Sequence, residues 1–294
     1  MDFSTALELF GLAIAATLIA GWIVPAVGGF LYLRRTSFYG LALPQLAACG
    51  VAAGFAAMPW WIAHVGLGDL DLMEAMEDTH AVMNYHLSWA TLFTSAGLGL
   101  LVFLGRFPGS EVARVAGLFV LASAATVIFA HLSPTGEIFV SELLRGEVLS
   151  VGRHELETLA VTLGLGYLAL QWLRNDLLLV SYDRETARVL GKRVTLLEAV
   201  LAVILAGTVA AGTMTVGPVV LFGLLVLPPI AARPFARSTA GFLWIASTFG
   251  LVSSAAGLWI SFHYDLPLGP CVVLAAGLAT VPGWVFARLR GTHA

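Results

Sequence analysis

Residues 196–232 read LLEAVLAVILAGTVAAGTMTVGPVVLFGLLVLPPIAA, an apolar stretch that contains a single charged side chain, Glu198. The stretch is long enough for two membrane-spanning helices, because one crossing takes about 20 residues. The segment from Gly212 to Pro218 interrupts it and predicts either a bend or a re-entrant turn. The number of crossings made here decides whether the whole chain has an odd or an even number of spans.

The composition of the whole chain places it in a membrane. Of the 294 residues, 59% are hydrophobic and 11% are charged, whereas a soluble domain carries about 25% charged residues. Lipid must therefore be the main solvent, and the backbone must satisfy its hydrogen bonds inside helices. We expect an all-α fold, a polytopic transmembrane helix bundle. The formal net charge of -3 indicates no binding of nucleic acid.

Apolar runs of membrane-spanning length recur from one end of the chain to the other. They predict about nine spans, and eight to ten would fit the same pattern. The runs are 10–33, 41–65, 87–105, 115–134, 154–173, 196–212, 217–232, 241–262 and 269–287. We expect residues 1–294 to form a single transmembrane domain with two longer polar segments on its outer side, 66–86 and 135–153.

The distribution of basic residues predicts the orientation of the chain. If Arg34 and Arg35 are cytoplasmic and the spans alternate, thirteen of the fifteen Lys and Arg residues fall on the cytoplasmic side. They are Arg34, Arg35, Arg106, Arg114, Arg174, Arg184, Arg188, Lys192, Arg193, Arg233, Arg237, Arg288 and Arg290. The positive-inside rule then favours nine spans, with the N-terminus outside and the C-terminus in the cytoplasm. We expect a multi-pass protein of a bacterial inner (cytoplasmic) membrane.

The segment 181–193, SYDRETARVLGKR, is a polar stretch between two spans on the predicted cytoplasmic side, and we expect it to be helical. Ala187 and Gly191 are four residues apart. On a helix they would share one face and leave a shallow depression for a side chain of another protein. The alternative is a solvated loop helix that only follows the positive-inside rule.

Three motifs in the second half of the chain resemble the ABC-3 family of metal permeases, the membrane subunits of zinc, manganese and iron importers. The coupling helix of that family, S-[FY]-D-x-x-x-A-x-x-x-G, is matched by Ser181, Tyr182, Asp183, Ala187 and Gly191. A second pattern, V-G-x-x-L-x-x-[AG]-L-L-V-x-P-x-x-x-A-R, is matched by Val216, Gly217, Gly223, Leu225, Val226, Pro228, Ala232 and Arg233. A third, Y-x-x-D-x-P-x-G, is matched by Tyr264, Asp265, Pro267 and Gly269, with a shorter Tyr-to-Asp spacing in this chain.

The resemblance implies a permease subunit that is not itself an enzyme. Zinc is the first expected cargo, followed by manganese or iron. The implied partners are a second permease copy, a cytoplasmic ABC ATPase, a periplasmic metal-binding protein and the lipid bilayer. No cofactor is expected on this chain, because ATP and Mg would bind to the ATPase. The sequence agrees, since Lys192 follows Gly191 without the earlier glycine or the following Ser or Thr of a phosphate-binding loop.

The outer segment 66–86 is acidic and contains two histidines. Its carboxylates and imidazoles form the densest group of metal-ligand types in the chain. We expect this segment either to capture a cation briefly or to form a solvated cap that docks the binding protein. The candidate residues are Asp69, Asp71, Glu74, Glu77, Asp78, His80 and His86.

The start of the second span departs from the family pattern. Metal permeases commonly read G-D-x-x-x-H there, a carboxylate and an imidazole one helical turn apart that suit zinc or manganese. In this chain Leu41 takes the aspartate position and Gln45 the histidine position, so the metal ligands are unknown. The candidates for lining a pathway are Gln45, Cys49 and His131. The alternative for Gln45 and Cys49 is that they only pack against neighbouring helices. The alternative for His131 is that its ring only reaches water at the membrane surface.

The sequence favours an ABC permease over other classes of membrane protein. A secondary transporter driven by an ion gradient would use spans broken by Gly and Pro, such as 212–218, but it also predicts ionisable residues buried within spans, and almost none occur. An ABC importer of a chelated or non-metal substrate is a further alternative. A membrane-embedded enzyme has little support, because the sequence lacks H-E-x-x-H and G-x-S-x-G motifs.

Overall fold

The computed structural model describes residues 3–64, 83–133, 140–141 and 151–289, and their regular elements are all helical. The named elements are α1 (Phe3–Leu33), α2 (Tyr39–His64), α4 (Met83–Leu104), α5 (Glu111–Leu132), α7 (Arg153–Trp172), α8 (Arg174–Tyr182), α9 (Arg184–Val189), α10 (Val194–Val216), α11 (Pro218–Ala232), the short 3-10 helix η2 (Arg233–Phe235), α12 (Thr239–Tyr264), α13 (Leu268–Leu278) and α14 (Thr280–Leu289).

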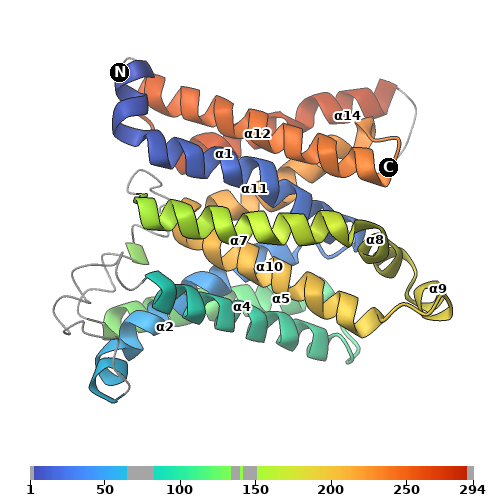
Figure 1. Ribbon diagram of the computed structural model, residues 1–294, viewed down its shortest axis with the longest axis horizontal. Helices are drawn as coiled ribbons and strands as arrows, with labels where there is room; N and C mark the ends of the chain where they lie inside the picture. The colour runs from blue at the N-terminus through green and yellow to red at the C-terminus, as the bar shows by residue number, and fades with distance from the viewer. Residues whose placement is uncertain (1–2, 65–82, 134–139, 142–150, 290–294) are drawn as a thin grey trace.

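The long helices lie side by side along a common direction, as a bundle of spans (Figure 1). Eight helical segments of the described chain are long and apolar enough to cross a membrane, and a ninth is the pair α7 and α8, which is bent by 72°. The predicted all-α polytopic bundle of about nine spans is confirmed. In agreement with an odd number, α1 begins at one end of the bundle and α14 finishes at the opposite end (Figure 1).

Two helices, α10 and α11, form from the long apolar stretch at 196–232. Gly217 alone separates them, with φ 81° and ψ 156°, a conformation that is essentially restricted to glycine. Pro218 then occupies the first turn of α11, where its missing N–H costs no helical hydrogen bond. Since α10, and α11 extended by η2, are each long and apolar enough to cross a membrane, the interruption separates two spans.

Helix backbones approach one another closely at glycines. A Cβ atom added to Gly28 of α1 would lie 2.0 Å from the carbonyl oxygen of Leu225 in α11. One added to Gly50 of α2 would lie 2.5 Å from the carbonyl oxygen of Trp89 in α4. Neither site has room for any side chain, so these glycines set how close the helices lie.

The turn between α12 and α13 is built by the third sequence pattern. Asp265 ends α12 in the left-handed conformation, with φ 50°. The N–H of Leu266 donates to the carbonyl oxygen of Ser261 (3.1 Å), and the Ser261 hydroxyl donates to the carbonyl oxygen of Leu266 (2.7 Å). Pro267 then precedes the first residue of α13. The residues of this pattern therefore form the turn that reverses the chain between α12 and α13. This structural role explains the pattern, and no bound ligand is needed to explain it.

We expect Gly217→Ala to lower the free energy of unfolding by about 1–3 kcal/mol, because alanine would have to hold a strained backbone at this turn. The measurement is thermal unfolding of the purified protein in detergent. The control is Gly99→Ala within α4, where a Cβ would meet no atom within 4 Å. That variant should be neutral or more stable by up to about 1 kcal/mol. Equal unfolding midpoints for the two variants would contradict the account of this turn.

Candidate functional site

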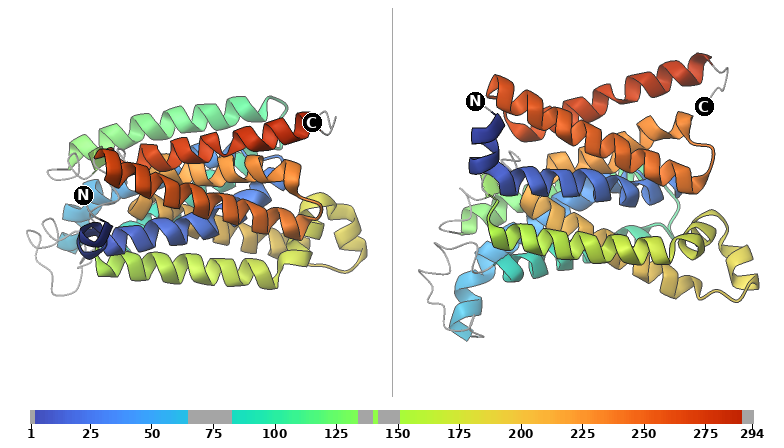
Figure 2. Two further views of the ribbon diagram at one scale, coloured as in Figure 1. Left: turned by 90° about the horizontal axis from the view of Figure 1, so that it is seen from above. Right: turned by 45° about the horizontal axis from the view of Figure 1, so that its top comes forward.

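The segment 181–193 lies at the end of the bundle where α14 finishes, and α8 and α9 project there beyond the spans (Figure 2). It is not one continuous helix as predicted. Helix α8 ends at Tyr182, and Asp183 is extended, with φ -147° and ψ 97°, before α9 begins at Arg184. The segment is therefore a bent unit of two short helices with a sharp break at the aspartate.

Asp183 builds the break by capping α9. Its carboxylate accepts hydrogen bonds from the backbone N–H (3.0 Å) and the hydroxyl (2.6 Å) of Thr186. These two hydrogen bonds hold the pKa of the Asp183 carboxyl below its usual value, and the bond from the Thr186 hydroxyl has the larger effect. The Ser181 hydroxyl donates back to the carbonyl oxygen of Leu177 (2.6 Å) and supports the end of α8. Both residues therefore serve the local shape.

Ala187 and Gly191 do not share a helix face, so that part of the prediction is wrong. Gly191 lies beyond the end of α9 with φ 74°, where it closes the helix, and the N–H of Lys192 donates to the carbonyl oxygen of Ala187 (3.0 Å). The Ala187 side chain is buried inside this chain. It leaves no depression open to another protein.

Three large apolar side chains of the segment are exposed among its charged ones, and two of the three stand at positions that the pattern leaves open. Tyr182 is 60% exposed, Val189 87% and Leu190 62%. Beside Tyr182 lies a cavity of about 240 Å³. It is lined by Leu33, Tyr182, Arg233, Ala236, Arg237, Ser238, Thr239 and Phe242. An apolar surface next to a basic cavity is thus available at this end of the bundle.

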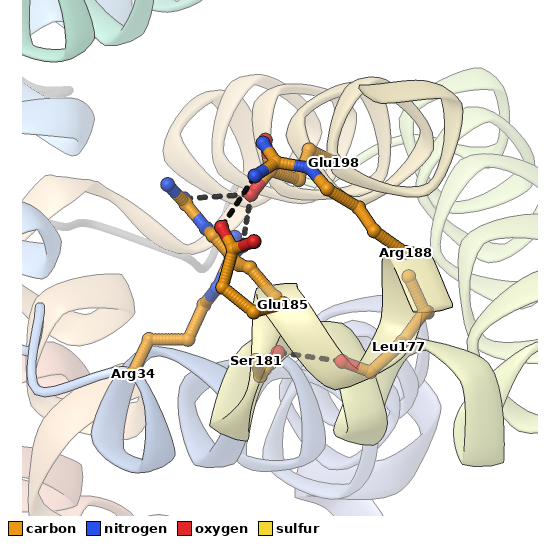
Figure 3. A network of polar contacts seen from close by, with 7 residues as sticks. Arg34, Leu177, Ser181, Glu185, Arg188 and Glu198 are labelled. Carbon is orange, nitrogen blue, oxygen red and sulfur yellow. Dashed lines mark hydrogen bonds and ion pairs between the residues drawn. The ribbon is translucent and has the colours of Figure 1, made fainter. Parts of the chain in front are cut away.

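An ion-pair cluster joins the segment to the spans (Figure 3). The Glu198 carboxylate of α10 lies 2.6 Å from the Arg184 guanidinium of α9 and 3.3 Å from the Arg34 guanidinium. Burial lowers the pKa of Arg34, while Glu198 acts in the opposite direction. Arg34 still carries its charge at neutral pH, because an arginine has a reference pKa above 12. Sequence reasoning missed this cluster, although Glu198 was the single charge in its apolar stretch.

The pathway candidates Gln45 and Cys49 meet at one threonine of a neighbouring helix. The Gln45 amide Nε2 of α2 donates to the Thr126 hydroxyl of α5 at 3.5 Å, and the Cys49 thiol lies beside the same hydroxyl. Cys49 and Thr126 are buried, whereas Gln45 is partly exposed. Sequence reasoning missed Thr126, whose only signal is a hydroxyl within an apolar span. Leu41, also partly exposed, cannot bind a metal ion.

The two described histidine candidates lie apart from this group. His131 is in the last turn of α5 with its side chain exposed. His86 belongs to α4 rather than to an outer polar segment, and it is fully buried against Phe55, with ring centroids 4.0 Å apart. Its ring approaches the Val51 backbone, but neither ring nitrogen has a partner in hydrogen-bond geometry. His86 is therefore not an exposed capture residue.

The remaining outer candidates lie outside the described residues. They are Asp69, Asp71, Glu74, Glu77, Asp78 and His80. Within the described part of the chain, no three or more His, Cys, Asp or Glu residues come together in a way that could hold a metal ion.

Comparison with known proteins connects this geometry to a family. The chain is 27% identical over 270 residues to the manganese import system permease protein ScaB of Streptococcus pneumoniae, covering 90% of this chain and 84% of that protein. It is 25% identical over 280 residues to the chelated iron transport system membrane protein YfeD of Yersinia pestis, covering 95% and 85%. A solved structure, PsaBC from Streptococcus pneumoniae in complex with Fab, contains a chain of the same fold, with a TM-score of 0.79, 20% identity and 98% coverage of both chains.

The family profile described as the ABC 3 transport family matches residues 6–287, which is nearly the whole chain. The match includes the α8–α9 segment, the turn at Gly217 and the reversal at Asp265. With its multi-pass helical fold, the chain therefore belongs to the ABC 3 transport family.

Proposed function

We propose that this chain is the membrane-spanning permease subunit of an ATP-binding-cassette importer that passes a divalent transition metal from a binding protein to the cytoplasm. The observation that carries this proposal is the family match over residues 6–287, together with an α8–α9 segment that projects from one end of the bundle. In this proposal the chain is not an enzyme, and a separate ATPase binds ATP and Mg.

The relatives' names order the candidate metals. One relative is named for manganese import and another for chelated iron transport. Both names favour manganese or iron ahead of zinc, which sequence analysis placed first. The partly exposed Gln45 offers an amide oxygen, and oxygen ligands suit manganese. Zinc instead prefers thiolate and imidazole ligands. The chelated form of the metal is a second candidate substrate, because of the iron relative.

The proposed orientation places the α9 end of the bundle in the cytoplasm of a bacterial cell, with the N-terminus outside. Arg34, Arg184 and Lys192 lie at this end, next to or within the α8–α9 segment. The positive-inside rule keeps such clusters in the cytoplasm, where an ATPase would be available. Helix α1 begins at the opposite end of the bundle (Figure 1).

A second permease copy completes the proposed pathway. Gln45 of α2 is partly exposed and His131 of α5 is exposed at the surface of the single bundle, while neighbouring positions on α2 are buried. If the pathway ran through the interior of one chain, the side chains that line it would be enclosed by that chain and would not lie at its surface. These two positions therefore suit a pathway that forms between two bundles.

The proposal is tested with the purified permease and its ATPase in liposomes. We expect ATP-dependent uptake of Mn²⁺ or Fe²⁺, measured with radioactive metal. Uptake of a chelated or organic substrate, with no uptake of manganese, iron or zinc, would contradict the metal assignment. Uptake that follows an ion gradient and ignores ATP would identify a secondary transporter. Within the described chain, however, no Asp, Glu, Lys or Arg side chain is buried, and His86 is the buried histidine.

We expect Gln45→Leu to lower the rate of metal uptake by at least about tenfold, because it removes the polar side chain that the pathway presents to the cation, and a lost ligand costs 1.4 kcal/mol or more. Uptake is measured at saturating ATP. The matched control is Ser123→Ala in α5, since the Ser123 hydroxyl bonds only to its own helix, at the Phe119 carbonyl (2.9 Å). Normal uptake by Gln45→Leu would remove Gln45 from the pathway.

We expect Val189→Asp to release the ATPase, because a charge at an 87% exposed apolar position would be buried without a partner at the docking surface. Co-purification of the ATPase should fall at least about tenfold, since an unpaired buried charge costs several kcal/mol. The control, Phe107→Asp, alters an exposed aromatic side chain in the α4–α5 turn of the same end. Equal ATPase recovery with both variants would place the docking surface elsewhere.

A further inference from the structure

Glu198 connects three segments that are far apart in the sequence. It lies in the second turn of α10. One of its two carboxylate oxygens, Oε1, pairs with both Arg184 at the start of α9 and Arg34 just after α1. Figure 3 shows the Arg34 side chain reaching across to this carboxylate from its own helix end. One acidic group therefore lies at the junction of the α8–α9 segment with two membrane spans.

The position of Arg34 is fixed by the way α1 ends. Arg35 takes a left-handed conformation with φ 61°, which is unusual for a residue other than glycine. The N–H of Arg35 donates to the Tyr32 carbonyl (3.0 Å), and that of Thr36 to the Leu31 carbonyl (2.9 Å). This pair of bonds is a Schellman closure, which ends a helix sharply. The Arg34–Glu198 pair thus connects α10 to a well-defined helix end.

Glu198 also separates two like charges. Three titratable side chains interact electrostatically with the Arg34 guanidinium: Glu198, Arg184 and Tyr39. Glu198 is the carboxylate among them. The Arg34 and Glu198 side chains are 20% and 29% exposed, so water screens this pair less than a pair on an open surface. A neutral residue in place of Glu198 would leave the two guanidinium groups facing each other, and they would repel.

The other ion pairs of the segment involve neither α1 nor α10. Glu185 pairs with Arg188 within α9, and Lys192 pairs with Asp176 of α8 at 2.7 Å. The Lys192–Asp176 pair holds the residues after α9 against α8. Among the described ion pairs, the two at Glu198 are the ones that join α9 to α1 and α10.

We propose that Glu198 is a positioning residue that couples α9 to α1 and α10, so that a movement of the cytoplasmic segment reaches two spans at once. This rests on the proposed function, because an ATPase must move α9. Helix α1 is well placed to pass the movement on, since Gly28 brings its backbone against α11. Loss of the carboxylate uncouples ATP hydrolysis from transport without preventing assembly.

The test measures ATP hydrolysed per metal ion transported, with the complete transporter in liposomes and Mn²⁺ as cargo. Glu198→Gln keeps the shape of the side chain and removes its charge. We expect the ratio to rise at least about fivefold while hydrolysis continues, which corresponds to a coupling energy near 1 kcal/mol. Arg184→Gln should give the same change, and the double variant no larger one, because the two residues form one pair.

The matched control is Glu185→Gln, which removes a carboxylate from α9, the helix of Arg184, but breaks a pair that stays within that helix. Its ratio should remain within about twofold of the wild type, because exposed ion pairs contribute little. A ratio within about twofold for Glu198→Gln would overturn the proposal. A parallel loss of transport and hydrolysis would overturn it as well, since this is the result of a purely structural role.

Assembly is checked by size-exclusion chromatography of each variant complex. If Glu198→Gln does not assemble, Arg184→Gln decides, because its side chain is 60% exposed and tolerates substitution. An unchanged ratio for Arg184→Gln would then overturn the proposal. A wild-type transporter without any ATP-dependent uptake would instead contradict the proposed function, so the two failures are distinguishable.

Discussion

The bundle depends on backbone contact between helices at positions without a side chain. Apolar side chains gain little free energy when they leave lipid to contact one another, because lipid tails are equally apolar. Helices in a membrane therefore associate through close packing. Gly28 places α1 against α11, and Gly50 places α2 against α4, at distances that exclude even a methyl group. At Gly250, a Cβ of α12 would lie 2.3 Å from the carbonyl oxygen of Gly21 in α1. Helix α1 is therefore locked on two sides, and the spans around it follow its position.

The sequence predicted the spans well because a membrane imposes a strong and simple pattern. Each crossing needs a long apolar run, and the structure has helices at all nine predicted positions. The division at 212–218 was open because length alone cannot distinguish a bend from a turn. Gly217 resolves it through a backbone conformation, which depends on two dihedral angles and not on hydropathy.

The sequence predicted the residues of the site less well, because a motif does not say which way its side chains point. The coupling role of Asp183, Ala187 and Gly191 stays a prediction, and their described roles, which the motif did not predict, are to cap α9, to form its buried side and to end it. Thr126 and the Glu198 cluster were missed because they join residues of different helices. Periodicity describes one helix at a time and cannot assign such pairs.

The division of labour in the α8–α9 segment has a consequence for the evolution of partner choice. The pattern residues maintain a common frame, while Val189 and Leu190 stand on its surface and make few demands on the fold. Under the proposed docking, these surface positions can change without loss of the frame. A cell with several related importers could therefore keep their ATPases from exchanging by varying a few side chains, and the shared motif would show no trace of that difference.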